Sequence, residues 1–195
     1  MSLATVNFES TGRTHAFSRI CFQHAAPMIE SALLGVFPLA LIYAALRDVG
    51  TFVIPNWLTG GLALLFVPLA LIAGMGLQDF GFHAAVGAGA LVAGMAAFAF
   101  RAAGGGDAKL FAAAALWLGP SAFLSFFVVM AFAGGLLGIA LMGFRRWPLP
   151  ASLSEVNWVL RLHSSAQGIP YGLAIAIGGV AAFPMSQLFA ALSAG

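Results

Sequence analysis

Long stretches without a charged residue constrain this chain more than any other feature. Five runs contain no Asp, Glu, Lys or Arg: 31–46, 49–78, 80–100, 110–144 and 162–195. A helix needs roughly 20 mainly apolar residues to cross a bilayer. The chain is 62% hydrophobic and only 7% charged, which leaves too few charges for the surface of a water-soluble protein. The sequence therefore predicts an all-α, polytopic membrane helix bundle.

Turn residues and charges suggest where each span begins and ends. We expect about six spans, over residues 26–46, 57–73, 82–100, 107–118, 121–144 and 169–192. The run 110–144 needs a break, because one helix of that length would be roughly 50 Å long, against a hydrocarbon core of about 30 Å. Gly119–Pro120 is the expected position of that break. Residues 1–25 are expected to form a polar N-terminal tail, and residues 26–195 a single membrane-embedded domain.

Basic residues in the connections predict the orientation of the bundle. If the connections after the first, third and fifth spans face the cytoplasm, that side holds Arg47, Arg101, Lys109, Arg145, Arg146 and Arg161. The connections on the opposite side then hold no basic residue, and only Arg13 and Arg19 of the tail oppose this arrangement.

Several classes of ligand are not expected. The net charge of +2 includes no extended basic cluster, so no nucleic-acid surface is predicted. The single cysteine, Cys21, excludes an internal disulfide and a Cys-based zinc site. No histidine pair has ligand spacing, so neither a metal nor another cofactor is expected.

Two aspartates are the conspicuous polar residues at the ends of predicted spans. Asp48 closes the first span and Asp107 opens the fourth, so both acids face the same side of the membrane. Ionisable residues at such positions are functional candidates. Two neighbouring carboxyl groups can share one proton, so that one activates a water molecule and the other polarises a peptide carbonyl. Each acid also has an ordinary explanation, Asp107 as a helix cap and Asp48 as an interfacial charge beside Arg47.

Three segments resemble the type IV prepilin peptidases, which are membrane aspartic peptidases of the GxGD class. "GGGDAKL" matches GxGD with a lysine two positions later. "RDVGTFVIPNWLT" resembles the family segment in which the first aspartate lies seven residues before the proline of Ile-Pro-Asn. The last span opens with "GIPYGLAIAIGG", which is similar to the short CpaA/TadV type that processes Flp-type pilins in tight-adherence systems.

The resemblance implies an activity and a set of site residues. Asp48 and Asp107 would be the catalytic pair of an endopeptidase in the bacterial inner membrane. This enzyme would cleave the leader from a single-span, Flp-type prepilin at the cytoplasmic face. Lys109 would either neutralise an acid on the substrate or steady the loop. Substrate-binding or loop-shaping roles fall to Gly104, Gly106, Lys109, Pro55 and Asn56.

The chain also departs from its longer relatives, and other functions stay open. The stretch "VGTFV" after Asp48 lacks the basic residues that family members often carry there. The bifunctional relatives have a Cys-rich cytoplasmic domain, which this chain lacks, so no methyltransferase activity is expected. A small ion- or proton-coupled transporter or channel could use the same two acids. A non-catalytic scaffold for a secretion assembly would function without either acid.

Other residues have expected structural roles. Gly134 and Gly138 form a small-xxx-small pair that favours close helix packing, within the chain or in a homo-oligomer. Asp79 is expected in a solvated turn and Glu30 near the interface, both on the side opposite the aspartate pair, and His83 could pair with Asp79. The tryptophans are expected at the membrane interfaces, as Trp57, Trp117, Trp147 and Trp158.

Overall fold

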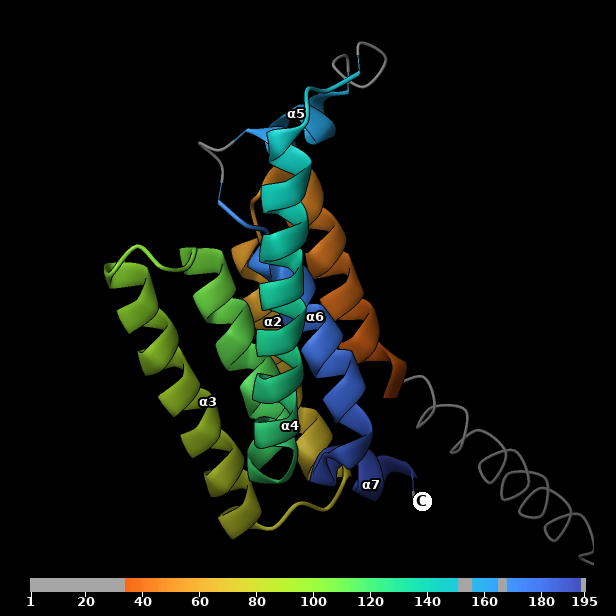
Figure 1. Cartoon of the computed structure of the whole chain (residues 1–195). Helices are drawn as coiled ribbons and strands as arrows, with labels where there is room; N and C mark the ends of the chain where they lie inside the picture. The colour runs from red at the N-terminus through yellow and green to blue at the C-terminus, as the bar shows by residue number, and fades with distance from the viewer. Residues whose placement is uncertain (1–33, 151–155, 165–167, 194–195) are drawn as a thin grey trace, which may run out of the picture.

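A computed structural model describes residues 34–150, 156–164 and 168–193, and the expected N-terminal tail and Glu30 lie outside these ranges. Every regular element within them is a helix (Figure 1), which confirms the all-α prediction. The first helix is described over Leu34–Thr51. The elements that follow are α2 (Asn56–Ile72), α3 (Leu77–Ala99), α4 (Gly105–Arg146), α5 (Asn157–His163), α6 (Tyr171–Ala182), the 3-10 turn η1 (Phe183–Met185) and α7 (Gln187–Ser193).

The long element α4 consists of two arms that fold back on each other. At Gly119 the backbone adopts φ 63° and ψ −173°, which no helix contains. The ring centroids of Phe111 and Phe127 are 6.5 Å apart, whereas a straight helix would separate these positions by about 24 Å. The predicted break at Gly119–Pro120 is therefore confirmed, and it creates the green and teal arms in Figure 1.

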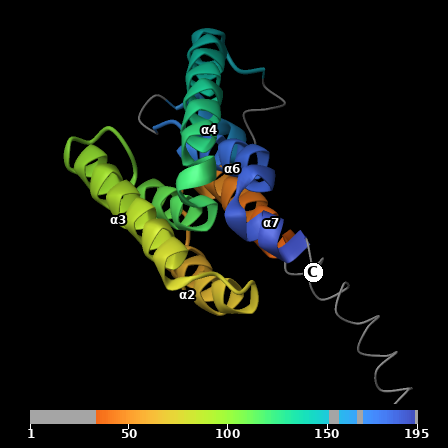
Figure 2. The same ribbon diagram turned by 90° about the horizontal axis from the view of Figure 1, so that it is seen from below.

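Glycines bring the two arms of α4 close to their neighbours. A Cβ at Gly87 of α3 would lie 2.9 Å from the Cβ of Leu116, so only glycine allows this approach to the first arm. The second arm packs on α6, where a Cβ at Gly134 would lie 3.1 Å from the Tyr171 ring. The predicted close packing of Gly134 thus occurs within the chain. Figure 2 shows the result, with α2 and α3 on one side of α4 and α6 and α7 on the other.

The described residues contain three or four candidate membrane spans. Three described helices are long and apolar enough to cross a membrane: Leu34–Thr51, Leu77–Ala99 and Gly105–Arg146. A fourth would be the pair Tyr171–Met185 and Gln187–Ser193, which is bent by 54°. This pair covers the predicted last span, 169–192, and η1, which contains Pro184, and Ser186 interrupt its helix. The total of about six spans stays a prediction.

Trp117 lies in the core and not at an interface. Its side chain is fully buried, its ring stacks on Phe37 at 5.1 Å, and its Nε1 donates a hydrogen bond to the Leu62 carbonyl at 2.8 Å. The prediction that Trp117 lies at a membrane interface is therefore wrong. Its indole N–H donates to a backbone carbonyl of α2 and not to interfacial water. The other three tryptophans are exposed, namely Trp57, Trp147 and Trp158.

The turn inside α4 depends on a contact between Gly119 and His83. His83 is fully buried in α3, and its Nδ1 pairs with the Leu116 carbonyl at 2.8 Å, while Asp79 is exposed in the first turn of that helix. A Cβ at Gly119 would overlap Cε1 and Nε2 of the His83 ring. The positive φ of Gly119 is a second obstacle to any other residue.

We expect Gly119→Ala to destabilise the protein by about 2–3 kcal/mol, from backbone strain and overpacking together. Thermal unfolding of the detergent-solubilised protein would measure the loss. Gly135→Ala is the matched control, because a Cβ at Gly135 meets nothing within 4 Å. Equal unfolding temperatures for the two variants would contradict the role assigned to the turn.

Candidate active site

Asp48 lies at the end of the first helix and is held by the start of α6. Its side chain is only 4% exposed, and its Oδ2 accepts a hydrogen bond of 2.7 Å from the Gly172 N–H. Gly172 belongs to the first turn of α6, where backbone N–H groups lack helical partners and the helix dipole favours a negative charge. Asp48 is therefore not the exposed interfacial charge that was one explanation for it.

Gly172 has a steric role as well. A Cβ at this position would lie 2.8 Å from Oδ2 and 2.9 Å from Cβ of Asp48. Real Cβ atoms hardly ever show contacts this short, so any side chain here would displace the carboxyl group or the helix. The absence of a side chain at Gly172 thus fixes where the Asp48 carboxyl can lie.

Asp107 lies in the first turn of α4, as predicted. Its Oδ2 accepts a hydrogen bond of 3.2 Å from the N–H of Gly104, the N-cap residue, so the explanation as a helix cap is correct. The neighbouring glycines shape the loop, because a Cβ at Gly104 would lie 2.9 Å from Oδ2 of Asp107 and one at Gly106 would lie 3.2 Å from Cβ of Ile54. The loop can therefore rest directly on the Ile-Pro-Asn segment.

The structure brings both carboxyl groups to one cavity of about 380 Å³. The loop before α4, the segment after the first helix and the residues before α6 form its walls, with Asp48, Phe52, Val53, Ile54, Asn56, Gly104, Gly105, Gly106, Asp107, Gly168 and Ile169 as lining residues. Two carboxylates in such an enclosure repel each other, so one shared proton would stabilise the pair.

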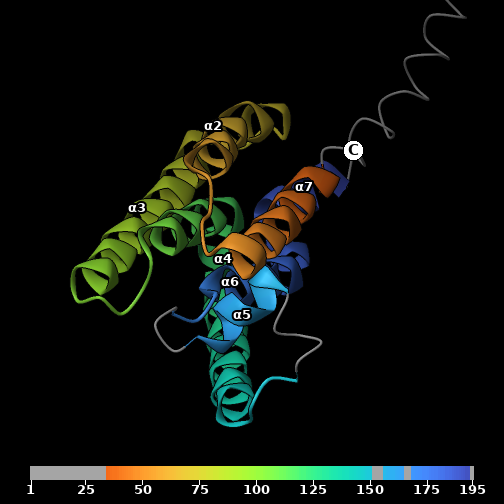
Figure 3. The same cartoon turned by 90° about the horizontal axis from the view of Figure 1, so that it is seen from above.

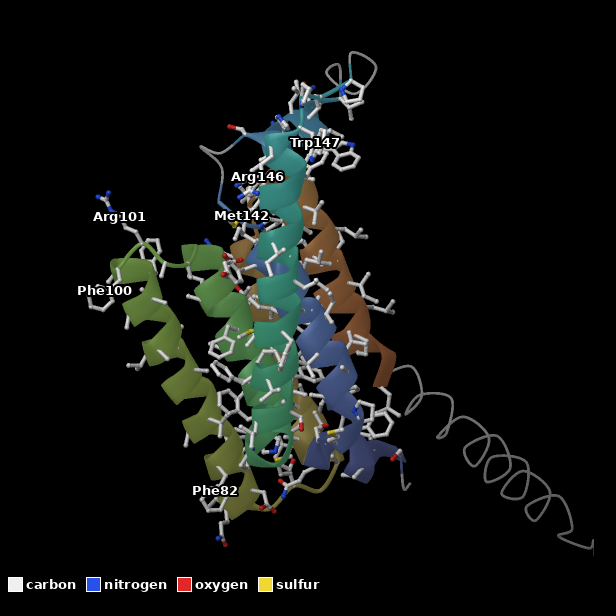
Figure 4. The ribbon with its side chains drawn as sticks, in the orientation of Figure 1. Phe82, Phe100, Arg101, Met142, Arg146 and Trp147 are labelled. Carbon is white, nitrogen blue, oxygen red and sulfur yellow. The ribbon has the colours of Figure 1, made fainter. Side chains whose placement is uncertain are left out.

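The cavity lies at one end of the helix bundle. Figure 3 looks onto this end, where α5 crosses above α6. In Figure 4 Arg101 and Arg146 extend from the same end, and Phe82 marks the opposite end. The acids thus lie at the end of the bundle where basic side chains gather.

Phe52 holds an unusual backbone conformation between Asp48 and the Ile-Pro-Asn segment. Its φ is +54°, and its N–H bonds to the Asp48 carbonyl at 2.8 Å, which ends the first helix. A bulky residue in this conformation costs on the order of 1–3 kcal/mol. The burial of Ile54, which is 6% exposed, helps to hold the strained turn in place.

Lys109 links α4 to α2. Its Nζ donates a hydrogen bond of 2.8 Å to Oδ1 of Asn56, the first residue of α2. Pro55, before it, is the N-cap of α2 with φ −67°. Of the two roles expected for Lys109, this contact supports the one in which the lysine steadies the loop.

Comparison with known proteins agrees with this arrangement. A family model described as the type IV leader peptidase family matches residues 35–139, which is more than half of the chain and includes both aspartates. The chain belongs to this family. Family membership indicates a peptidase, with a prepilin as substrate and the lipid bilayer as surroundings. No curated protein and no solved structure matched the chain.

Two features of the candidate site were not predicted from the sequence. No role was predicted for Gly172, although a glycine directly after Pro-Tyr at the start of a helix is a signal for close approach. Phe52 carried no signal, since nothing in its type indicates a positive φ. Among the described residues, no group of three or more His, Cys, Asp or Glu side chains could hold a metal ion.

We expect the Lys109–Asn56 bond to contribute modestly to the stability of the peptidase. Because both residues are exposed, a double-mutant cycle with Lys109→Ala and Asn56→Ala should give a coupling energy of about 0.5–1 kcal/mol. Unfolding of the four proteins in detergent would measure it. A coupling energy of zero would show that the bond does not tie the two helices together.

Proposed function

We propose that this peptidase is an aspartic endopeptidase in which Asp48 and Asp107 act as a catalytic pair. The observation that carries the proposal is that these acids, from helices well separated in the sequence, line the same small cavity. The family supplies the reaction class, which is the hydrolysis of a peptide bond.

In this mechanism the two carboxyl groups share one proton. The ionised carboxylate takes a proton from a water molecule, whose oxygen attacks the carbonyl carbon of the scissile peptide bond. The protonated carboxyl group donates its proton to the carbonyl oxygen. When the tetrahedral intermediate collapses, the C–N bond breaks and the leaving nitrogen receives a proton from the acid pair. The helix N-termini beside Asp48 and Asp107 favour the ionised member of the pair.

The substrate we propose is a Flp-type prepilin, cleaved between its leader and its hydrophobic helix at the cytoplasmic face. Support for the cytoplasmic face comes from the basic residues at the same end of the bundle, including Arg101 and Arg146 (Figure 4). Support for the Flp type comes from the Pro-Tyr-Gly segment that opens α6. With one cysteine in the chain, the Cys-rich domain of methylating relatives has no counterpart, so we propose cleavage without methylation.

Reconstitution tests the proposal. The purified peptidase in liposomes is mixed with a Flp-type prepilin and S-adenosylmethionine, and the products are read by gel mobility and mass spectrometry. We expect a shortened pilin whose new N-terminal amine carries no methyl group, and cleavage at least roughly 10²-fold slower by the double variant Asp48→Asn/Asp107→Asn. Cleavage at the normal rate by the double variant would contradict the aspartate pair, and a methylated product would contradict the restriction to cleavage.

A further inference from the structure

Asp107 also lines a second cavity, which the reaction described above does not use. This α3–α6 cavity has a volume of about 270 Å³ and extends between α3, both arms of α4 and α6. Apart from Asp107 and Tyr171, the side chains that line it come from Ala, Gly, Phe, Met and Ile residues. It is therefore an apolar space with one carboxyl group on its wall.

The α3–α6 cavity borders the catalytic pair. Asp107 lines both cavities. Tyr171, on the α6 wall, directly precedes Gly172, whose N–H binds Asp48. A chain that occupies the α3–α6 cavity would thus have its backbone beside both acids.

Size and chemistry restrict what can occupy the cavity. A dry apolar cavity of about 150 Å³ is large enough to hold benzene, so the larger α3–α6 cavity can take a branched or aromatic side chain. A cation or a polar ligand would find only one acid here and almost no hydrogen-bond partners. Apolar side chains gain free energy from burial in such a space.

The direction of the cavity favours one half of the substrate. One wall begins at Ala102 and Ala103, which follow α3 beside the exposed Arg101, and continues along α3 to Ala97 and Ala93. Figure 4 shows Arg101 at the end of the bundle, so this wall leads from the charged end into the membrane-spanning part. The substrate half that continues into the membrane is the hydrophobic helix, because the leader is the part released at the surface.

We propose that the α3–α6 cavity binds the first apolar side chains after the scissile bond, at the start of the prepilin's hydrophobic helix. This inference rests on the proposed function. In this arrangement the catalytic cavity holds the scissile peptide bond beside the two carboxyl groups, and the α3–α6 cavity holds the residues that follow that bond.

A larger cavity on the other side of α3 is an alternative binding site for these substrate residues. It has a volume of about 420 Å³ and lies between α2, α3 and the first arm of α4, with Ala88 on its α3 wall. Neither catalytic acid lines it, and two of its polar residues, Asn56 and Lys109, are bonded to each other. It therefore offers no route by which a bound chain would present a peptide bond directly to Asp107.

Disulfide cross-linking distinguishes the two cavities. The background is full-length Cys21→Ser/Asp48→Asn, which removes the only cysteine of the chain and slows turnover. Ala97→Cys and Ala88→Cys are matched probes, the same substitution on the same helix but in different cavities. Each is combined with prepilins that carry a single cysteine at one of the first four positions after the scissile bond. A disulfide needs Cβ atoms about 3.5–4.5 Å apart.

We expect a cross-linked product from Ala97→Cys with at least one of these prepilins and none from Ala88→Cys. A link from Ala88→Cys instead, or no link from Ala97→Cys, would overturn the proposal. If Ala97→Cys falls below normal membrane levels, Ala93→Cys probes the same cavity. The cross-link does not depend on turnover. Cleavage at the normal rate in the Asp48→Asn background would contradict the aspartate pair and would still leave the cross-link readable.

Filling the cavity gives a second readout. Ala97→Leu should lower kcat/KM for a prepilin with large apolar residues after the bond by at least roughly 10- to 200-fold, the range for a change of one methylene group in a hydrophobic pocket. A prepilin with alanines at these positions should lose much less, because it leaves room for the new side chain. Ala88→Leu should leave both values unchanged. An equal loss for both prepilins with Ala97→Leu would overturn the proposal.

Discussion

Replacing either Asp48 or Asp107 with asparagine is expected to slow prepilin cleavage by roughly 10²–10⁴-fold, the usual contribution of a general acid or base. Asparagine has the size of aspartate but can neither take a proton from water nor donate one from a carboxyl group. It can still accept the hydrogen bond from Gly172 or from Gly104, so both cavity walls should persist. The rate of leader removal under single-turnover conditions measures the effect.

The shape of the result matters as much as its size. Because the two acids act as one unit, the double variant should cleave at nearly the same rate as the slower of the two single variants. Asp79→Asn is the matched control, since Asp79 is an exposed acid in the first turn of α3. Normal cleavage by either single variant at equal membrane level would remove that aspartate from the mechanism. Additive losses would indicate two independent roles.

The same variants separate the peptidase from the transporter considered on sequence grounds. A proton-coupled transporter would lose flux in proteoliposomes when either acid is neutralised, without any change in a co-reconstituted prepilin. The family match makes cleavage the first measurement. Flux that depends on Asp48, together with an uncut prepilin, would favour the transporter.

Much of the fold followed from local signals in the sequence. The uncharged runs indicated membrane helices, and Gly119–Pro120 marked the turn within α4, because a glycine with positive φ before a proline cannot continue a helix. The helix boundaries were harder, since α3 begins at Leu77 and includes part of a segment that was expected to be a turn. From the sequence alone, glycine and polar residues at the start of a membrane helix look like a loop between two helices.

The parts of the site that escaped prediction depend on contacts between distant segments. Gly172 and Asp48 are 124 residues apart in the chain, and nothing near either residue indicates their hydrogen bond. The burial of Trp117 likewise depends on a carbonyl of α2, 55 residues away. Asp48 and Asp107 were paired from the sequence because the number of intervening spans places them on one side, an argument that gives the side but not the cavity.

Gly172→Ala should reduce cleavage by at least roughly 10²-fold, the cost of misplacing a reacting group by about 1 Å. The new Cβ would lie 2.8 Å from Oδ2 and 3.0 Å from Cγ of Asp48, so the carboxyl group must move or α6 must shift. Alanine is a better helix former than glycine by about 1 kcal/mol, so the folded protein need not lose stability. We therefore expect a protein that unfolds near the normal temperature and cleaves poorly.

The control for this prediction lies in the same cavity. Gly168 also lines it, but a Cβ there meets nothing within 4 Å, so Gly168→Ala should cleave at nearly the normal rate. Parallel measurement of kcat/KM and of the unfolding temperature separates displacement of Asp48 from a general loss of folding. If Gly172→Ala cleaves as fast as Gly168→Ala, the close approach of α6 does not position the carboxyl group for catalysis. If both variants fail equally, backbone flexibility around the cavity is required rather than the contact between Gly172 and Asp48.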